Sequence, residues 1–241
     1  MSSLVLVRHG QASFLAEDYD VLSPLGEEQA RQLGRYWARI GARVDEVWVG
    51  PRVRQVRTAE LAGEAFRAEG GVAWPEPQAL AALDEYHAEH VMKHAAAELA
   101  LRDDSVRELA LAFAAASERR DRARTFEKLF QAVTKRWVAG ELVVPGIETW
   151  AEFSTRVHDG IAQLTRDSTR GGRTVLAFTS AGTIGVSLQA VLGVPAVAAL
   201  ELGWVVRNAA ISELLFSGGR VTLSSFNALP HLPDPAQWTY R

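Results

Sequence analysis

The chain has 241 residues, of which 48% are hydrophobic and 23% charged, with a net charge of -3. This is the composition of a globular protein with a large core, and the slight negative charge argues against a general nucleic-acid binder. The absence of cysteine excludes disulfides and thiolate metal sites. No stretch approaches the roughly 20 apolar residues of a membrane span, and Leu4–Val7 is too short for a signal peptide. We therefore expect a cytoplasmic protein with no membrane partner.

The N-terminal stretch Leu4–Gly10 reads Leu-Val-Leu-Val-Arg-His-Gly. Its short apolar run predicts a buried strand of a parallel sheet, and ligands bind at the carboxyl ends of such strands. His9 there offers a nucleophilic nitrogen, and Arg8 offers a charged fork for phosphate or carboxylate. Gly10 permits a tight turn or a close approach to a ligand. The alternative is a strand end with a solvated arginine and a structural histidine.

The following segment predicts a loop, a helix, a strand and a turn: residues 11–22, Pro24 to about Ile40, Val44–Val49 and Gly50–Pro51. Ser23 is the expected N-cap of the helix, followed by proline at its first position.

After the turn, the first turns of another helix carry Arg52, Arg54 and Arg57. A helix N-terminus favours anions, so cations gathered there indicate a bound anion nearby. The sequence therefore predicts a phosphate site, with a solvated basic helix face as the alternative.

These motifs together resemble the histidine phosphatase superfamily, which includes the histidine-type phosphoglycerate mutases. The resemblance is carried by the motif at residues 8–10, by Ser-Pro-Leu-Gly-Glu-Glu-Gln-Ala at 23–30, and by Arg54 with Thr58-Ala59. It implies a phosphohistidine formed at His9 and a phosphate-clamping arginine at Arg54.

The superfamily's second block resembles Ser-Pro-Leu-x-Arg-Ala-x-x-Thr-Ala, which places its arginine at Arg54 and not at Arg52. Two residues of this chain depart from that block. Gly50 stands where serine is usual, and Gln55 stands where alanine is usual.

The third block is Leu83-Asp84-Glu85-Tyr86. The superfamily has Leu-x-Glu here, so the resemblance implies that Glu85 is the proton donor. A carboxylic acid can supply the proton that an alkoxide leaving group needs. Asp84 remains an alternative, because the sequence does not say which carboxyl points inward.

Residues 87–145 are expected to form a helical insertion within a single domain of residues 1–241. The superfamily resemblance implies that it lies near the active-site mouth and selects substrates, while plain core packing is the alternative. His87, His90 and His94 invite a metal interpretation, but the motif lacks the glutamate of zinc proteases and a third ligand is not evident. We therefore expect no metal and no cofactor.

The C-terminal part predicts a turn, a helix, a strand, a second helix and a hairpin: Pro145–Gly146, Glu148–Asp167, Arg173–Phe178, a helix ending near Leu192, and Ile211–Phe226 turning at Gly218–Gly219. The closing Asn227–Leu232 also resembles the superfamily, and we interpret its His231 as structural.

The fourth block, Thr179-Ser-Ala-Gly-Thr-Ile184, carries the main departure. The superfamily form resembles Ser-His-Gly-Gly-Thr-Ile, so Ser180 replaces a second histidine and Ala181 replaces a glycine. The resemblance implies that this position contacts the phosphoryl group. Ser180 keeps a hydrogen-bond donor there and loses a positive charge.

The sequence thus predicts a three-layer α/β/α fold with a mostly parallel sheet, an antiparallel edge hairpin and a helical insertion. The expected function is metal-independent hydrolysis of a small-molecule phosphate ester. Its residues are His9 and Glu85 in catalysis, and Arg8, Gly10, Arg54, Ser180 and Ala181 in phosphate binding. A phosphoglycerate mutase primed by 2,3-bisphosphoglycerate and a catalytically weakened phospholigand-binding protein are the alternatives. The oligomeric state stays open between monomer and homodimer.

Overall fold

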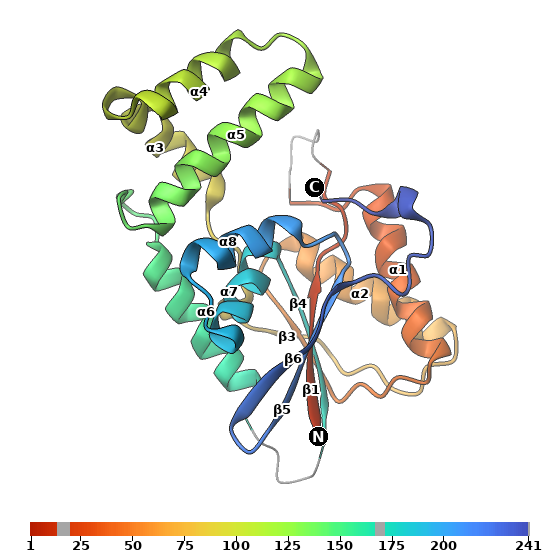
Figure 1. Cartoon of the computed structure of the whole chain (residues 1–241). Coiled ribbons are helices and arrows are strands. Elements are labelled where there is room, and N and C mark those ends of the chain that lie inside the picture. The colour runs from red at the N-terminus through yellow and green to blue at the C-terminus, as the bar shows by residue number, and fades with distance from the viewer. Residues whose placement is uncertain (14–19, 167–171, 241) are drawn as a thin grey trace. The chain divides into compact units, whose positions relative to one another are not determined.

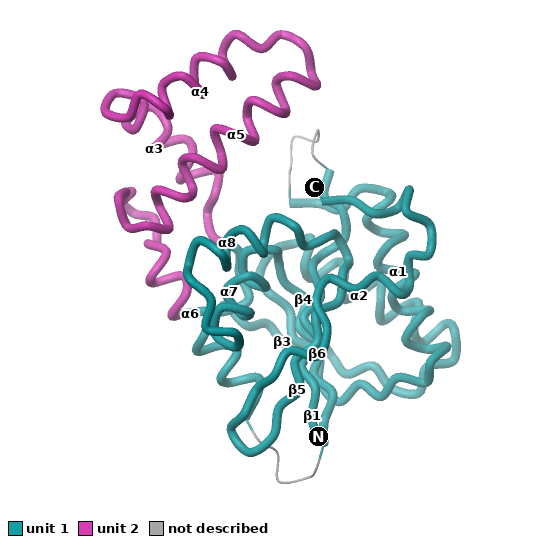
Figure 2. Tube along the Cα trace, viewed as in Figure 1, with its two compact units in different colours: residues 1–85, 156–241 teal, residues 86–155 magenta. Residues whose placement is uncertain are grey.

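The computed structural model describes residues 1–13, 20–166 and 172–240. The chain divides into two compact units, one of residues 1–85 and 156–241 and the other of residues 86–155 (Figure 2). The helix α6 (Trp150–Leu164) belongs to both, because the second boundary falls within it.

A six-stranded sheet forms the centre of the first unit, in the order β3-β2-β4-β1-β5-β6. Its strands are β1 (Ser2–Arg8), β2 (Glu46–Val49), β3 (Gln78–Ala79), β4 (Thr174–Thr179), β5 (Ile211–Ser217) and β6 (Arg220–Ala228). The first four in this order are parallel, and β5 and β6 are antiparallel to their neighbours. Gly218 and Gly219 both have positive φ in the turn between β5 and β6, as a two-residue hairpin turn requires.

Helices cover both faces of this sheet (Figure 1). One side carries α1 (Pro24–Arg39) and α2 (Val53–Ala68), and the other carries α7 (Ala181–Leu192), α8 (Ala196–Val205) and the end of α6. Alternate residues of a strand point to opposite faces, so β1 must be apolar throughout to fill both layers. Val5 and Val7 pack into the core beneath α1 and α2, and Leu4 and Leu6 are also fully buried.

The local sequence explains how α1 begins and packs. The Ser23 side chain accepts a hydrogen bond from the Gly26 N–H, which caps the helix at its proline start. At Gly34 the helix touches α2 so closely that a Cβ atom would lie 2.0 Å from the Ala62 carbonyl oxygen. Glycine is therefore needed where these two helices cross.

The second unit is helical and contains α3 (Ala88–Arg102), α4 (Asp104–Ala115) and α5 (Arg119–Val138). Asp103 links all three, since it follows α3, caps α4 and pairs with Arg136 of α5. These contacts lower the pKa of Asp103 to about 2, first through the hydrogen bond from Ser105 and then through that from Arg136.

The fold class predicted from the sequence is confirmed, including the mostly parallel sheet and the edge hairpin. The short strand β3 and the helix α8 had no counterpart among the predicted elements. The helix expected over Glu148–Asp167 begins at Trp150 and ends at Leu164, and Asp167 lies outside the described residues. The loop expected over residues 11–22 contains a bridge between Ala12 and Leu22, and residues 14–19 lie outside the described part.

Candidate active site

The candidate residues are gathered where three parallel strands end. The register pairs Arg8 of β1 with Thr179 of β4, and Phe178 of β4 with Val49 of β2. The segments after these strands therefore emerge side by side at one edge of the sheet. The Thr179 hydroxyl donates to the Leu83 carbonyl at 2.6 Å, which brings the third block to the same edge.

His9 is 5% exposed and both of its ring nitrogens have partners. Nδ1 lies 2.7 Å from the Gly10 carbonyl oxygen, and Nε2 lies 3.1 Å from Arg54 Nε. A carbonyl only accepts and a guanidinium only donates, so Nδ1 carries the proton and Nε2 carries the lone pair. The ring is therefore in the tautomer whose Nε2 can attack an electrophile.

The surroundings also keep this ring neutral. The pKa of His9 lies well below its usual 6.5, chiefly because the ring is buried and then because of the positive charges of Arg54 and Arg8. The Nδ1 hydrogen bond to Gly10 opposes this shift. Burial and the two cations outweigh this hydrogen bond, so the imidazole stays neutral and nucleophilic at physiological pH.

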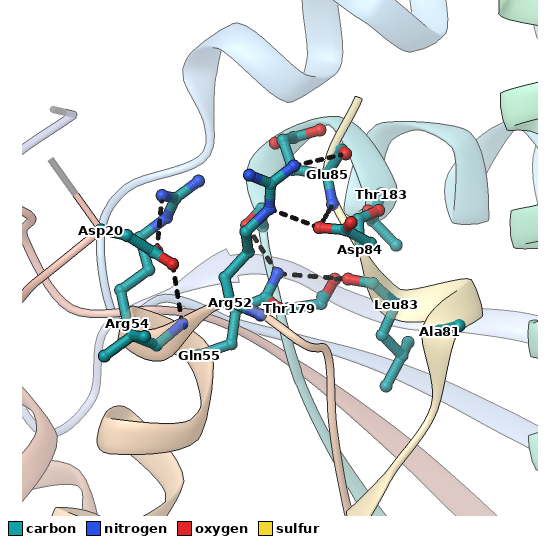
Figure 3. A network of polar contacts seen from close by, with 12 residues as sticks. Asp20, Arg52, Arg54, Gln55, Ala81, Leu83, Asp84, Glu85, Thr179 and Thr183 are labelled. Carbon is teal, nitrogen blue, oxygen red and sulfur yellow. Dashed lines mark hydrogen bonds and ion pairs between the residues drawn. The ribbon is translucent and has the colours of Figure 1, made fainter. Parts of the chain in front are cut away.

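Arg54 is held from two sides. Its Nε donates to His9, and its Nη1 donates to Asp20 Oδ1 at 2.9 Å (Figure 3). The other carboxylate oxygen of Asp20 accepts from the Val53 N–H at 2.9 Å, at the first residue of α2. One carboxylate thus binds both the guanidinium and the helix N-terminus, which are the two groups predicted to bind phosphate.

Arg8 and the backbone of His9 are fixed by the loop after α8. Arg8 is 9% exposed and its Nη1 donates to the Val206 carbonyl. The His9 carbonyl accepts from the Asn208 side chain at 3.3 Å and from the Ala209 N–H at 3.2 Å. The sequence interpretation singled out neither Asp20 nor Asn208, because neither residue belongs to a motif with a recognisable spacing.

Gly10 makes a close approach, but to protein backbone. A Cβ atom there would lie 2.3 Å from the Gly26 carbonyl oxygen, in the first turn of α1. The Gly10 N–H donates to the Thr58 hydroxyl, which itself donates to the Arg54 carbonyl. The packing of α1 alone therefore accounts for the glycine, and contact with a ligand stays a prediction.

The two neighbouring carboxylates of the third block have different partners. Asp84 accepts from Arg52 Nε at 2.5 Å and from the Glu85 N–H at 2.8 Å, so it fixes the turn (Figure 3). Glu85 Oε2 accepts from the Gly182 N–H at 2.9 Å, in the first turn of α7. Arg52, the first arginine of the basic run, thus orients the loop that carries Glu85.

Ser180 is the N-cap residue of α7, yet its side chain makes no capping hydrogen bond. Its hydroxyl instead accepts from Gln55 Nε2 at 2.8 Å, and both side chains are almost fully buried. Ala181, beside it, is half-buried and begins α7. The departure from pattern at Gln55 was the sequence signal for this contact.

Arg57, His231 and the histidines of the second unit are the remaining candidates. Arg57 pairs with Glu60 and Glu64 on the exposed side of α2. His231 is buried, and neither of its ring nitrogens has a partner within residues 1–13, 20–166 and 172–240. The rings of His87 and His90 are 5.6 Å apart in the second unit.

Among the residues that the structure describes, no group of three histidine, cysteine, aspartate or glutamate side chains could hold a metal ion. In the same residues, no helix is both long and apolar enough to cross a membrane.

Comparisons with known proteins concern the family and the fold of the chain. The family description "Histidine phosphatase superfamily (branch 1)" matches residues 4–110 and 102–229. A 2,3-bisphosphoglycerate-dependent phosphoglycerate mutase of Thermobifida fusca is 42% identical over 94 residues, and the match spans only 36% of each protein.

Two solved structures share the fold at low identity. A mutant phosphoserine phosphatase from Entamoeba histolytica, in complex with phosphoserine, is 18% identical with a TM-score of 0.62, over 96% of this chain and all of that one. A phosphoglycerate mutase from Bacillus anthracis is also 18% identical with a TM-score of 0.62, over 96% of this chain and 95% of that one.

Proposed function

Because the chain belongs to branch 1 of the histidine phosphatase superfamily, we propose that it hydrolyses phosphate monoesters of small molecules without a metal, through a phosphohistidine at His9. The observation that carries this proposal is the state of His9. Its Nδ1 proton is bound by the Gly10 carbonyl, its Nε2 lone pair faces Arg54, and its pKa is lowered. A buried, neutral and oriented imidazole suits a nucleophile.

In the first step, His9 Nε2 attacks phosphorus in line with the ester oxygen. The N–P bond forms as the P–O bond breaks, and protonated Glu85 transfers its proton to the leaving oxygen, which departs as an alcohol. The carboxylate that remains has a backbone donor in the Gly182 N–H.

In the second step, the Glu85 carboxylate takes a proton from water as the water oxygen attacks phosphorus. The N–P bond breaks, its electrons return to Nε2, and inorganic phosphate leaves. Glu85 is then protonated and His9 neutral, as at the start.

Arg8 and Arg54 stabilise the charge on the equatorial phosphoryl oxygens, together with the N-terminus of α7. Phosphoryl transfer depends chiefly on such electrostatic stabilisation. Both arginine residues are about nine-tenths buried, and charge-assisted hydrogen bonds are strong in such surroundings. Gly10, Ser180 and Ala181 complete the proposed phosphate-binding set.

The sequence match to a phosphoglycerate mutase favours a second candidate function. A mutase would use the same residues but return the phosphoryl group from His9 to another oxygen of the substrate, after priming by 2,3-bisphosphoglycerate. The match covers about a third of each protein, and Ser180 replaces the second histidine of the pattern. We therefore rank hydrolysis first.

The first experiment measures hydrolysis of an aryl phosphate in the presence of a chelator. We expect turnover by the wild type, loss of turnover in His9→Ala, and no change in His90→Ala, a histidine variant in the exposed part of α3. Equal turnover in wild type and His9→Ala would contradict the proposal. Phosphoserine and 3-phosphoglycerate then serve as substrate probes, and coupled isomerisation of 3-phosphoglycerate detects the mutase.

Tight binding of phosphate esters without turnover of any of these substrates would instead favour the phospholigand-binding alternative. Placement of residues 87–145 at the active-site mouth, a cytoplasmic location and the choice between monomer and homodimer stay predictions.

A further inference from the structure

We propose that Gln55 is a positioning residue of this site, whose amide fixes the Ser180 hydroxyl as a hydrogen-bond donor to the transferring phosphoryl group. The inference rests on the proposed function and deepens it. It assigns a chemical role to the pair that stands where the superfamily pattern has alanine and histidine.

The orientation of the Gln55 amide follows from two backbone groups with fixed roles. Oε1 lies 3.1 Å from the Arg52 backbone nitrogen, which can only donate. Nε2 lies 3.2 Å from the Leu83 carbonyl oxygen, which can only accept. Exchanging the amide oxygen and nitrogen would place two donors face to face at Arg52 and two acceptors at Leu83. The amide therefore has one favourable orientation (Figure 3).

This orientation decides what the Ser180 hydroxyl does. The second Nε2 hydrogen of Gln55 points to Ser180 Oγ at 2.8 Å, so Oγ is the acceptor of that bond. The hydroxyl hydrogen must then be donated in another direction. Within the described ranges 1–13, 20–166 and 172–240 the one hydrogen bond of this hydroxyl is the one accepted from Gln55, so the hydroxyl hydrogen has no acceptor, and Ser180 is 1% exposed. A buried donor of this kind costs free energy until an acceptor binds.

The position of Ser180 indicates which acceptor that is. The preceding residue, Thr179, accepts the His9 N–H at its carbonyl oxygen, at 2.9 Å. Two residues after Ser180, the Gly182 N–H donates a hydrogen bond to Glu85 Oε2. Ser180 therefore stands between the proposed nucleophile and the proposed acid, where an anionic phosphoryl oxygen would accept its hydrogen.

Gly50 shows that the pair is part of a larger arrangement. A Cβ atom at this position would lie 2.1 Å from Gln55 Oε1 and 2.7 Å from the Leu83 carbonyl oxygen. In this arrangement the Gln55 amide and the Leu83 carbonyl together leave no room for a Cβ atom at position 50. Three of the four departures from the superfamily pattern, at Gly50, Gln55 and Ser180, form one compatible set, which argues for a retained function at Ser180.

The test is a double-mutant cycle on aryl phosphate hydrolysis and on inhibition by vanadate. Ser180→Ala should lower kcat by about 100-fold, the effect of losing one donor to a developing oxyanion. Gln55→Glu keeps the size of the side chain but offers acceptors only, so the Ser180 hydroxyl turns towards residue 55. We expect a similar loss of kcat, and little further loss when Ser180→Ala is added.

Arg57→Gln, on the same helix and paired with the exposed Glu60 and Glu64, is the control that should keep wild-type kcat. Melting temperatures identify any variant that fails to fold. If Gln55→Glu fails to fold, Gln55→Ala replaces it in the cycle. Adding Ser180→Ala to Gln55→Ala should then again cause little further loss of kcat.

Losses that multiply in the double variant, or wild-type kcat in Gln55→Glu or Ser180→Ala, would overturn this inference while hydrolysis by the wild type stands. Absence of wild-type hydrolysis and of vanadate binding would overturn the proposed function as well.

Discussion

Arg54 Nε donates a hydrogen bond of 3.1 Å to His9 Nε2, the atom proposed to attack phosphorus. The lone pair is therefore occupied by a guanidinium, which must turn to a phosphoryl oxygen when substrate binds. One arginine thus selects the histidine tautomer in the free protein and can stabilise charge during transfer. The hydrogen bond therefore joins the predicted nucleophile, His9, to the predicted phosphate-binding residue, Arg54.

We expect Arg54→Ala to lower kcat/KM by about 100-fold or more, which corresponds to ~3 kcal/mol of transition-state stabilisation. Arg54→Lys should recover only part of this loss, because a single ammonium group cannot reproduce the planar fork that meets both His9 and Asp20. Steady-state kinetics on an aryl phosphate measure both variants. Arg57→Ala is the matched control, and activity within threefold of wild type in Arg54→Ala would rule out the assigned role.

The lowered pKa of His9 predicts how the first step depends on pH. An imidazole with the usual pKa of 6.5 is about nine-tenths protonated at pH 5.5 and loses its lone pair. The pKa of His9 is lowered by burial and by two arginines, so we expect no fall in the rate of phosphohistidine formation as the pH is lowered from 7.5 to 5.5. Single-turnover measurements in buffers between these pH values give this rate directly.

The same experiment has an internal control. Arg54→Gln removes a charge that lowers the His9 pKa, so the residual rate of this variant should decline at a higher pH than the wild-type rate. A wild-type rate that falls about tenfold between pH 7.5 and 5.5 would show that His9 titrates like an exposed histidine.

Asp20 binds the two groups that a phosphate would use, Arg54 Nη1 and the Val53 N–H. Its carboxylate therefore competes with anionic ligands for the arginine and for the N-terminus of α2. We expect Asp20→Asn, which keeps an acceptor but loses the charge, to bind inorganic phosphate several-fold more tightly than the wild type. Isothermal titration calorimetry of both proteins tests this, and weaker phosphate binding in Asp20→Asn would mean that Asp20 mainly orients Arg54.

Local patterns in the sequence were sufficient for much of the fold. The apolar run before Arg8 and the Ser23-Pro24 helix start depend on neighbouring residues only, so they could be predicted. The two-residue strand β3 is too short to show a period, and its pairing with Trp48 and Val49 of β2 is a long-range property. The sequence could not have indicated it.

The candidate site likewise combines residues that local motifs could predict with long-range contacts that they could not. The superfamily pattern selected Arg54 over Arg52, and the structure places Arg54 against His9. The partners of Asp84 and Gln55 lie 32 and 125 residues away in the chain, at Arg52 and Ser180. Such contacts depend on how the strand ends meet, so they become visible only in three dimensions.

His231 predicts an acid sensitivity of the fold. Its ring is buried, and this burial lowers the pKa from 6.5 to about 3. Between these values the unfolded chain binds a proton that the folded protein does not, so the free energy of unfolding falls as the pH falls. The contribution is about 1.4 kcal/mol per pH unit for one such group.

Replacing His231 by methionine, a side chain that does not titrate and fills irregular spaces, should remove this contribution. We expect wild type to lose about 2 kcal/mol more stability than His231→Met between pH 7 and pH 5, because 1.5 pH units of that interval lie below 6.5. His9 has the same sign of effect but is present in both proteins, so it cancels in the comparison. Urea unfolding at the two pH values measures the difference, and equal losses in the two proteins would show that His231 gains a proton while folded.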